Sequence, residues 1–294
     1  MSSTAVPPED SDSGPLQAEE PQAARGRARP EEGSSPNGTI IVKIGGSTLG
    51  NHDTTLQDLV EVQREGTPQV VVHGGGKLIS EWMERRGARP RFVRGLRVTD
   101  SASLEIVVAV LTGLVNKSIV ASINELGGRA IGISGVDGGM LKAEIADPDL
   151  GLVGSIVDVD TRPIEVIVDA GFIPVIAPVA VRASNPSSDA SQMLNVNADT
   201  AAGEIAAALD ADRLVLLTDV EGVLDTSRRL IPRLTRRQAS GMVRFGVVAG
   251  GMAPKIGACL KALERVRATH IIDGRRPHSL KDTLTGKALG TRLD

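Results

Sequence analysis

Aromatic side chains are nearly absent from this sequence of 294 residues, which holds one tryptophan, three phenylalanines and no tyrosine. Proteins that stack on nucleic-acid bases need such rings, so the sequence argues against a surface of that kind. The net charge of -3 provides no electrostatic attraction to phosphate backbones. The sequence therefore predicts no nucleic-acid partner, and its core must consist of valine, isoleucine, leucine and alanine.

Cysteine occurs once, as Cys259, which excludes an intrachain disulfide and fits a reducing cytoplasm. We expect Cys259 to pack in the core, because it lies in an apparent helix. The four histidines do not have the spacing of metal ligands. No apolar run approaches the roughly 18 residues of a membrane span. A cytoplasmic location without a membrane partner is therefore predicted.

Residues 1–38 differ in composition from the rest. They hold six of the sixteen prolines, seven acidic residues and three arginines, with almost no large apolar residues. Such a segment cannot bury enough apolar surface to offset the entropy of ordering. It lacks the apolar core of a signal peptide and is too acidic for an organelle transit peptide. We predict a disordered N-terminal tail at 1–38 and a folded body from residue 39.

Short apolar strands alternate with helices along the body. The predicted strands are 39–45, 69–76, 129–135, 172–178, 213–222 and 269–274, and the predicted helices are 53–66, 77–87, 101–128, 164–171, 198–211 and 255–266. This alternation is typical of an α/β fold with a mainly parallel sheet, because helices join its strands. The stretches 138–160 and 179–197 instead predict β-hairpins beside the sheet. The arginine-rich stretch 87–100 predicts a loop.

Glycines cluster at three predicted entries into helices, at Gly45-Gly46, Gly74-Gly75-Gly76 and Gly250-Gly251. Ligands of α/β folds bind beyond the carboxyl ends of strands, where a helix N-terminus offers unpaired N–H groups to an anion. The G-x-G-x-x-G fingerprint is absent at these places, and Gly76-Lys77 is followed by Leu78 rather than the Ser or Thr of a P-loop. The pattern predicts an anion site of another kind, with tight turns as the alternative.

Two lysines occupy unusual places. Lys43 lies inside the apolar strand IIVKIGG, where a charge needs a partner unless the strand is an edge strand with the lysine turned to solvent. Lys255 lies at a helix start in AGGMAPKIG, where a cation opposes the helix dipole unless an anion binds. Two such lysines would hold one phosphoryl group from both sides. This would favour phosphoryl transfer by positioning and charge neutralisation, without a covalent intermediate.

The segment LNVNADT (194–200) adds polar groups before an alanine-rich helix. Asn195 and Asn197 would face the same way in an extended strand, and we expect them to hydrogen-bond a substrate. Asp199 would organise the lysine ammonium groups, or alternatively cap the helix. Arg97, in RGLRVTD, is suited to a bidentate contact with a carboxylate, unless it belongs to a solvated basic loop.

In this order, the motifs IIVKIGG, VVVHGGG, GLRVTD, LNVNAD, LVLLTDVEGVLD, GGMAPK and LGTRLD resemble the amino-acid kinase family. The resemblance covers residues 39–294. The pair GLRVTD and NVNAD is most similar to the members that phosphorylate N-acetyl-L-glutamate. The resemblance implies an open αβα sandwich with two lobes. Residues 39–195 would bind the acyl amino acid and dimerise, and residues 196–294 would bind the nucleotide.

The implied reaction transfers a phosphoryl group from ATP to the side-chain carboxylate of N-acetyl-L-glutamate, the second step of arginine biosynthesis. Mg2+ would be held mainly by ATP, so no metal-binding residues of the protein are expected. By position, Lys43 and Lys255 would be catalytic and Asp199 would orient them. The acceptor would be bound by Gly75, Gly76, Arg97 and Asn195, with Asn197 added by its spacing. The nucleotide would be bound by Gly45, Gly46, Thr218, Asp219 and Val223.

Other interpretations stay open. One is a kinase of carrier-protein-linked aminoadipate or glutamate, which the GLRVTD loop without an aromatic residue disfavours. Another is a non-catalytic nucleotide- or amino-acid-sensing protein, against which the two lysines argue. The segment 278–291 resembles the arginine site of arginine-inhibited members, but 29–39 contains no plausible N-terminal helix of that type, so regulation is undecided. A homodimer or higher homo-oligomer is expected.

Overall fold

The computed structural model describes residues 1–2, 38–45, 54–184, 191–248 and 250–294. Every element named below belongs to the unit Gly33–Asp294. The predicted tail 1–38 lies almost wholly outside the described residues. The division of the body into lobes between residues 195 and 196 stays a prediction.

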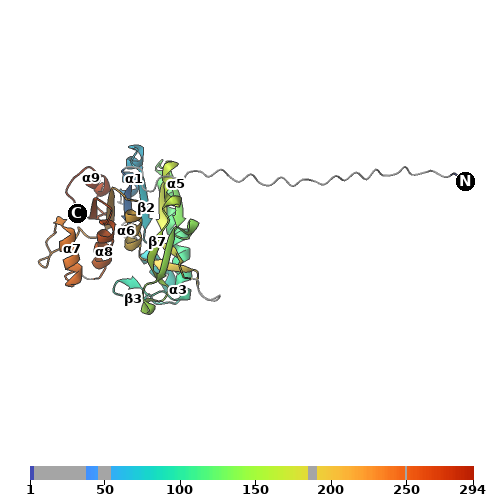
Figure 1. Cartoon of the computed structure of the whole chain (residues 1–294), viewed down its shortest axis with the longest axis horizontal. Helices are drawn as coiled ribbons and strands as arrows, with labels where there is room; N and C mark the ends of the chain where they lie inside the picture. The colour runs from blue at the N-terminus through green and yellow to red at the C-terminus, as the bar shows by residue number, and fades with distance from the viewer. Residues whose placement is uncertain (3–37, 46–53, 185–190, 249) are drawn as a thin grey trace, which may run out of the picture. The chain divides into compact units, whose positions relative to one another are not determined.

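A mainly parallel sheet of eight strands organises the body (Figure 1). The strands β12 and β14 run parallel to each other and opposite to the other six. This confirms the predicted fold class, although β12 and β14 were not predicted. The order across the sheet is β12 (Arg233–Leu234), β14 (Thr291–Leu293), β13 (Ala268–Asp273), β11 (Arg213–Thr218), β1 (Ile40–Ile44), β2 (Gln69–His73), β8 (Ile173–Ala177) and β5 (Ala130–Ser134).

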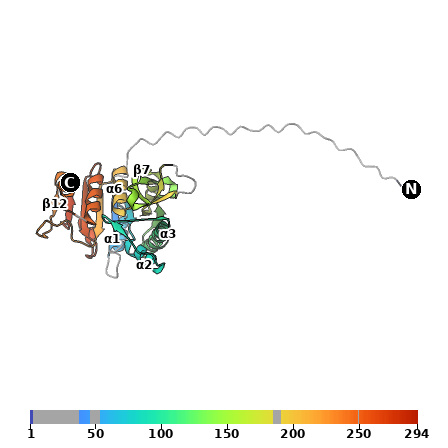
Figure 2. The same ribbon diagram turned by 90° about the horizontal axis from the view of Figure 1, so that it is seen from below.

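Helices lie in layers beside the sheet (Figures 1 and 2), and alternate residues of β1 pack against different layers. Val42 belongs to the core cluster that includes residues of α1 (Thr55–Arg64), α4 (Asn116–Glu125) and α9 (Ser279–Leu284). Ile41 belongs to the cluster built with α5 (Arg162–Asp169), α6 (Ala198–Ala208), α7 (Arg236–Arg244) and α8 (Met252–Ala262). Side chains two apart on a strand share a face. Lys43 therefore points to the same side as Ile41, toward α6 and α8.

The predicted helix 101–128 forms as one stretch, Ser101–Glu125, made of α3 (Ser101–Val108), a π-helical segment (Ala109–Val115) and α4. By length and composition alone this stretch could cross a membrane, which corrects the expectation that no apolar run is long enough. It is a partly buried core helix, with 39% of its most apolar window buried. Val107, Val110 and Ile123 are fully buried.

The two predicted hairpins are present but do not stay separate. Strand β6 (Leu141–Ile145) pairs antiparallel with β7 (Val153–Val159), and β9 (Val179–Arg182) pairs antiparallel with β10 (Met193–Val196). Parallel pairings of β10 with β7 and of β6 with β9 close the four strands into a small barrel. Short 3₁₀ turns lie at Asp137–Gly139 and Pro148–Leu150.

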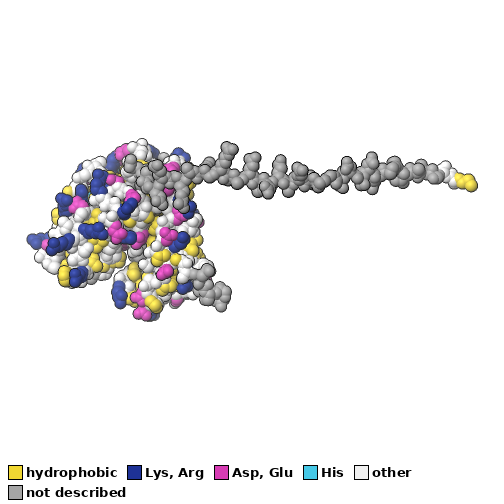
Figure 3. Space-filling view, viewed as in Figure 1, with side chains coloured by type: hydrophobic (Ala, Val, Ile, Leu, Met, Phe, Trp, Pro, Cys, Tyr) yellow, Lys and Arg dark blue, Asp and Glu magenta, His cyan; other side chains and the backbone are white. Residues whose placement is uncertain are grey.

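The region 87–100, expected to be a loop, contains a small hairpin. Strand β3 (Phe92–Val93) pairs antiparallel with β4 (Leu96–Arg97). The turn residues Arg94 and Gly95 both have positive φ, 51° and 82°, which matches a turn that suits the twist of two short strands. On the face of the molecule that Figure 3 shows, acidic and basic side chains are interspersed.

Candidate active site

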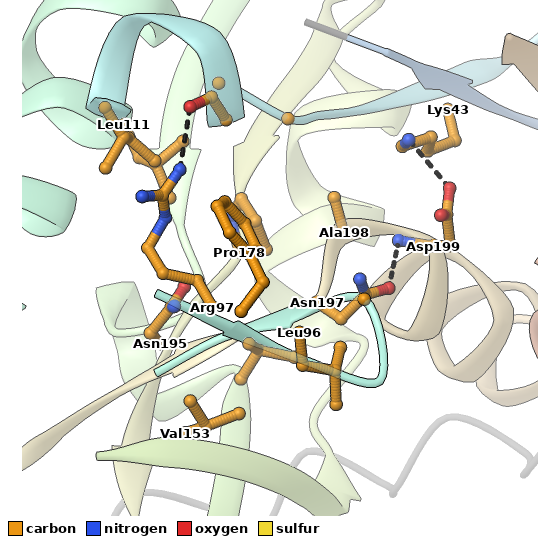
Figure 4. A pocket seen from close by; sticks show the side chains of 17 residues that line it. Lys43, Leu96, Arg97, Leu111, Val153, Pro178, Asn195, Asn197, Ala198 and Asp199 are labelled. Carbon is orange, nitrogen blue, oxygen red and sulfur yellow. Dashed lines mark hydrogen bonds and ion pairs between the residues drawn. The ribbon is translucent and has the colours of Figure 1, made fainter. Parts of the chain in front are cut away.

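Two lysines from distant parts of the chain converge on one buried carboxylate. Lys43 Nζ lies 2.7 Å from Asp199 Oδ1, and Lys255 Nζ donates a hydrogen bond to Asp199 Oδ2 at 3.0 Å. Lys43 belongs to β1, Asp199 to the first turn of α6, and Lys255 to the start of α8. The sequence predicted that these three side chains act together, and the structure brings them together. Figure 4 shows the ion pair of Lys43 with Asp199.

The charges of this cluster do not cancel. Burial raises the pKa of the Asp199 carboxyl, but the nearby charges of Lys43 and Lys255 outweigh burial, and the pKa lies below its ordinary value. The carboxylate is therefore ionised at neutral pH and faces two ammonium groups. A buried cation without a counter-charge is costly, so the surplus positive charge favours an anion. The lysine side chains keep exposed fractions of 8% and 18%, which leaves them reachable.

Lys43 lies in the middle of the sheet. Its strand β1 is flanked by β11 and β2, with Lys43 opposite Leu216 and Val72. The alternative interpretation, an edge-strand lysine turned to solvent, is therefore wrong. Within the described residues, Asp199 Oδ1 accepts no aligned hydrogen bond. Lys43 holds this oxygen at 2.7 Å and lowers the pKa of the Asp199 carboxyl. Because an ammonium group has three N–H donors, Lys43 can hold Asp199 and also donate to a second oxygen.

Asn197, rather than Asp199, caps α6. Its Oδ1 accepts hydrogen bonds from the backbone N–H groups of Asp199 at 2.9 Å and Thr200 at 3.0 Å. This satisfies two backbone N–H donors of the first turn of α6, so the capping alternative for Asp199 is wrong. The cap also occupies the side-chain oxygen of Asn197, Oδ1. Of this side chain, the Nδ2 amino group is then left to hydrogen-bond a substrate. Asn195 Nδ2 donates to Thr99 Oγ1 at 3.1 Å.

Arg97 ties the β3–β4 hairpin to helix α2 (Gly76–Arg85). Its Nη2 donates to Gly76 O at 2.8 Å and to Ser80 Oγ at 2.9 Å, and its guanidinium stacks on Phe92. The side chain is buried, and burial lowers its pKa. Arg97 is therefore not part of a solvated basic loop. Its contact with a substrate carboxylate stays a prediction.

A pocket of about 210 Å³ is lined by Lys43 and Asp199 of this cluster, whereas Lys255 does not line it (Figure 4). The polar side chains that line it are Lys43, Asp199, both asparagines and Arg97, and Figure 4 shows Arg97 and Asn195 apart from Lys43 and Asp199. The glycines 74–76 line it where α2 begins, and first-turn N–H groups have no partner inside a helix. The rest of the wall is apolar. Charged side chains together with an apolar wall suit a small acid that carries an uncharged substituent. The apolar lining consists of Ile79, Phe92, Leu96, Leu111, Val153, Pro178, Val196 and Ala198.

The residues predicted for the nucleotide lie at the neighbouring strand end. Gly45 follows β1 and lies beside Thr218 at the end of β11, because Ile44 pairs with Leu217. Gly46 lies outside the described residues. Neither Thr218, Asp219 nor Val223 lines the pocket described above. The structure thus separates these residues from those that line the pocket, and their contact with a nucleotide stays a prediction.

Two of these residues have internal contacts of their own. Thr218 Oγ1 has one hydrogen, which it can donate to the carbonyl oxygen of Val220 at 2.9 Å or of Ile272 at 3.3 Å. Val223 is fully buried, and its N–H donates to Thr291 Oγ1 at 2.8 Å. Both residues therefore shape the loop after β11. The contact predicted between this loop and a nucleotide would therefore depend on Thr218 and Val223.

Sequence reasoning passed over Leu111, Thr99 and Ser80. Thr99 and Ser80 hold Asn195 and Arg97 through their hydroxyl groups. Leu111 enters the pocket from the π-helical segment. Thr99 lies within the quoted motif GLRVTD, so a signal for it existed. The segment around Leu111 reads as an ordinary apolar helix, and no local signal marks that residue.

A buried Lys–Asp–Lys cluster, next to glycine loops at the carboxyl edge of a parallel sheet, defines a site that can hold a phosphoryl group during transfer. Residues 38–273 match the amino acid kinase family. The chain belongs to this family, as its motifs indicated.

The relatives within the family are more specific. The chain is 47% identical over 265 residues to the acetylglutamate kinase of Caldanaerobacter subterraneus subsp. tengcongensis, covering 87% of each protein. It is 41% identical over 259 residues to that of Dehalococcoides mccartyi, covering 88% of this chain and 95% of the relative. Among solved structures it is similar to smu.665 of Streptococcus mutans UA159. That similarity has a TM-score of 0.73 and 28% identity, and covers 87% of this chain and 98% of the other.

Proposed function

We propose that this protein is an acetylglutamate kinase, which transfers the γ-phosphoryl group of ATP to the side-chain carboxylate of N-acetyl-L-glutamate. The products are ADP and the acyl phosphate N-acetylglutamyl 5-phosphate, in the second step of arginine biosynthesis. The observation that carries the proposal is the pair of lysines on Asp199, with Lys43 and Asp199 themselves lining a pocket of about 210 Å³. The identities of 47% and 41% to acetylglutamate kinases support the choice of substrate.

The reaction needs charge stabilisation more than it needs a nucleophile from the protein. An oxygen of the acceptor carboxylate attacks the γ-phosphorus, and the bond from phosphorus to the ADP oxygen breaks. Lys43 and Lys255 approach from two elements and would neutralise negative charge on the transferring group. Asp199 keeps the two ammonium groups at a defined spacing before the substrate binds, so little rearrangement is required during the reaction.

The acceptor would occupy the pocket between the hairpin and α2. Gly75 and Gly76 would offer backbone N–H groups, while Arg97 and Asn195 would contact the carboxylate and acetylamino groups. Asn197 keeps its amide nitrogen for the same ligand. The apolar wall suits the acetyl methyl group, because a buried methyl group gains free energy by leaving water.

The nucleotide would lie along the ends of β1 and β11. Gly45 and Gly46 would approach its phosphates, and the loop containing Thr218, Asp219 and Val223 would frame it. Mg2+ bound with ATP would neutralise part of the triphosphate charge. Within the described part of the chain, no group of three or more His, Cys, Asp or Glu side chains could hold a metal. The Asp199 carboxylate is already engaged by both lysines. We therefore propose that Mg2+ is carried mainly by ATP.

The proposal includes the organisation of the protein. Residues 39–195 would form the acceptor lobe, and residues 196–294 the nucleotide lobe. We further propose a cytoplasmic enzyme, where ATP is available and the buried Cys259 stays reduced. A homodimer is the expected assembly.

Hydroxylamine trapping tests the proposal directly, because it converts an acyl phosphate into a coloured hydroxamate. We expect MgATP-dependent hydroxamate with N-acetyl-L-glutamate and little with glutamate or N-acetyl-aminoadipate. Turnover only with another carboxylate, or only with a carrier-protein-linked acid, would overturn the substrate. Nucleotide binding without turnover of any acid would instead support a sensing protein. Running the assay with and without arginine also decides whether arginine inhibits.

A further inference from the structure

The glycine loop after β2 has a buried support behind it. His73, the last residue of β2, and Asn116, the first residue of α4, are 0% and 1% exposed. Asn116 Nδ2 lies 3.2 Å from His73 Nε2, and His73 Nδ1 lies 3.1 Å from Gly74 O. A continuous path of polar contacts therefore runs from α4 through an imidazole to the loop that lines the pocket.

The contacts of Asn116 determine which way these hydrogen bonds run. Asn116 Nδ2 faces the carbonyl oxygens of Val175 at 2.8 Å and Ile133 at 3.3 Å, and Oδ1 accepts from Lys117 Nζ at 3.0 Å. The amino group is thus on the side of His73. One of its two hydrogens goes to Val175 O at 2.8 Å, and the other is shared between Ile133 O at 3.3 Å and His73 Nε2 at 3.2 Å, so that Nε2 accepts. An imidazole nitrogen that accepts carries no proton. The proton of neutral His73 is therefore on Nδ1, where it donates to Gly74 O.

Two features of the fold keep Asn116 at this place. A Cβ atom on residue 132 would lie 2.0 Å from Asn116 Oδ1, so the glycine at Gly132 on β5 makes room for the amide. Asn116 also follows directly after the π-helical segment Ala109–Val115. A π turn holds more residues than an α turn and changes which side chains face the sheet.

The imidazole of His73 is neutral at physiological pH. Burial lowers its pKa to about 4, against the hydrogen bond to Gly74, which raises it. The positive charges of Lys117 and Lys43 lower the pKa further. The single proton on Nδ1 is therefore present throughout the neutral range.

We propose that Asn116 and His73 are positioning residues that turn the N–H group of Gly75 toward the acceptor pocket. The C=O of Gly74 and the N–H of Gly75 belong to one planar peptide and point in opposite directions. Because His73 holds the oxygen on the core side, the N–H faces the side of the pocket, which all three glycines line. Without that bond the peptide between two glycines would rotate at little cost.

This inference rests on the proposed function, because the group that the N–H meets would be the acceptor carboxylate or the migrating phosphoryl group. The sharpest variant is Asn116→Asp. The new carboxylate can only accept, so His73 must place a proton on Nε2, and the carboxylate raises the pKa of the imidazole. Below that pKa the imidazolium donates from both nitrogens and Gly74 stays held. Above it, Nδ1 has no proton and the hold on Gly74 O is lost.

We expect kcat/KM for N-acetyl-L-glutamate in Asn116→Asp, divided by the wild-type value, to fall about tenfold from pH 6 to pH 9, the size of one hydrogen bond. Asn124→Asp is the matched control. Asn124 lies on the same helix, and within the described residues its side chain only accepts, from Ala130 N at 2.9 Å, which an aspartate can also do. The control ratio should stay flat. A flat ratio in Asn116→Asp would overturn the proposal.

A second measurement does not depend on whether Asn116→Asp folds. Imidazole ¹⁵N shifts of the wild type report which nitrogen is protonated, and His73→Asn identifies the signal among the four histidines. We expect neutral His73 with the proton on Nδ1. A proton on Nε2 would overturn the proposed hydrogen bonds from Asn116 through His73 to Gly74. If the wild type makes no hydroxamate, the proposed function fails. The tautomer of His73 still decides whether His73 holds Gly74 O. His73→Asn should keep more activity than His73→Gln, because only the shorter amide reaches Gly74 O.

Discussion

At the scale of single residues, the site depends on charges that the interior does not fully balance. Lys43 and Lys255 are held by one carboxylate, and Asp199 stays ionised because the two lysines outweigh its burial. An anion that enters between the lysines relieves their surplus charge. The residues that hold the site in its resting state are thus the residues that would stabilise the reaction.

Replacing either lysine by alanine should reduce kcat by a factor on the order of 10² to 10³, the usual loss for one donor to a developing charge. KM for the acceptor should change much less, because the acceptor-binding groups remain. The rate of hydroxamate formation measures both constants. Lys287→Ala, at an exposed ion pair with Asp282, is the control and should retain wild-type turnover. Full activity in both Lys43→Ala and Lys255→Ala would contradict the proposed roles.

These charged residues could be predicted because a lysine inside an apolar strand is unusual and can be recognised from the sequence alone. The capping role of Asn197 could not be predicted. Whether it caps α6 or faces a ligand depends on where the helix begins, and the same residue type suits both roles. Asp199 lies two residues further on, so its freedom to bind the lysines follows from the cap.

At the scale of elements, the contact between α6 and α8 sets the distance from Asp199 to Lys255. Gly203 on α6 lies against the backbone of Ala258 on α8, where an added Cβ would be 2.6 Å from the Ala258 oxygen. Backbone atoms cannot move aside as a flexible side chain can. The two helices therefore stay close only because residue 203 is glycine.

Gly203→Ala should force the helices apart and lower the free energy of unfolding by about 1–3 kcal/mol, as overpacking does. It should also cut kcat by a factor on the order of 10², because a displacement of about 1 Å is enough for that. Thermal denaturation and the hydroxamate rate test both effects. Gly257→Ala on α8 meets no atom within 4 Å and should be neutral or slightly stabilising. Equal behaviour of the two variants would show that the helix contact does not position Lys255.

Elements with strong patterns were predictable, and short irregular ones were not. The six strands of the parallel core were expected from their apolar runs. The hairpin at Phe92–Arg97 was missed because strands of two residues have no periodicity. The π-helical segment was missed because its residues are as apolar as those of an ordinary helix. Helix α7 was also missed, although Thr235 and Gln238 form a capping box at its start.

At the scale of the whole molecule, the sheet ends in β5, which within the described residues has one strand neighbour, β8. An edge strand presents unpaired backbone groups that another chain can cover. Ile131 on β5 and Leu114 on the adjoining π-helical segment are both large and exposed. We take this edge as the surface through which the expected homodimer forms.

Light scattering after size exclusion should give about 61 kDa, twice the 30.7 kDa of one chain. A charge at a buried interface without a partner is costly, so Ile131→Glu should shift the mass toward that of one chain. Val166→Glu, at an exposed valine of α5, is the control and should leave the mass unchanged. A wild-type mass of one chain would contradict the dimer, and an unchanged Ile131→Glu mass would move the interface elsewhere.

The sequence by itself determined the fold class, the family and the three charged residues of the site, because apolar periodicity and an out-of-place charge are properties of the chain order. Only the tertiary structure decided what those residues do to one another. The pairing of Lys43 and Lys255 on Asp199, the cap at Asn197 and the path from Asn116 through His73 to Gly74 join residues up to 212 positions apart. Such contacts arise from how strands and helices pack, which no local pattern encodes.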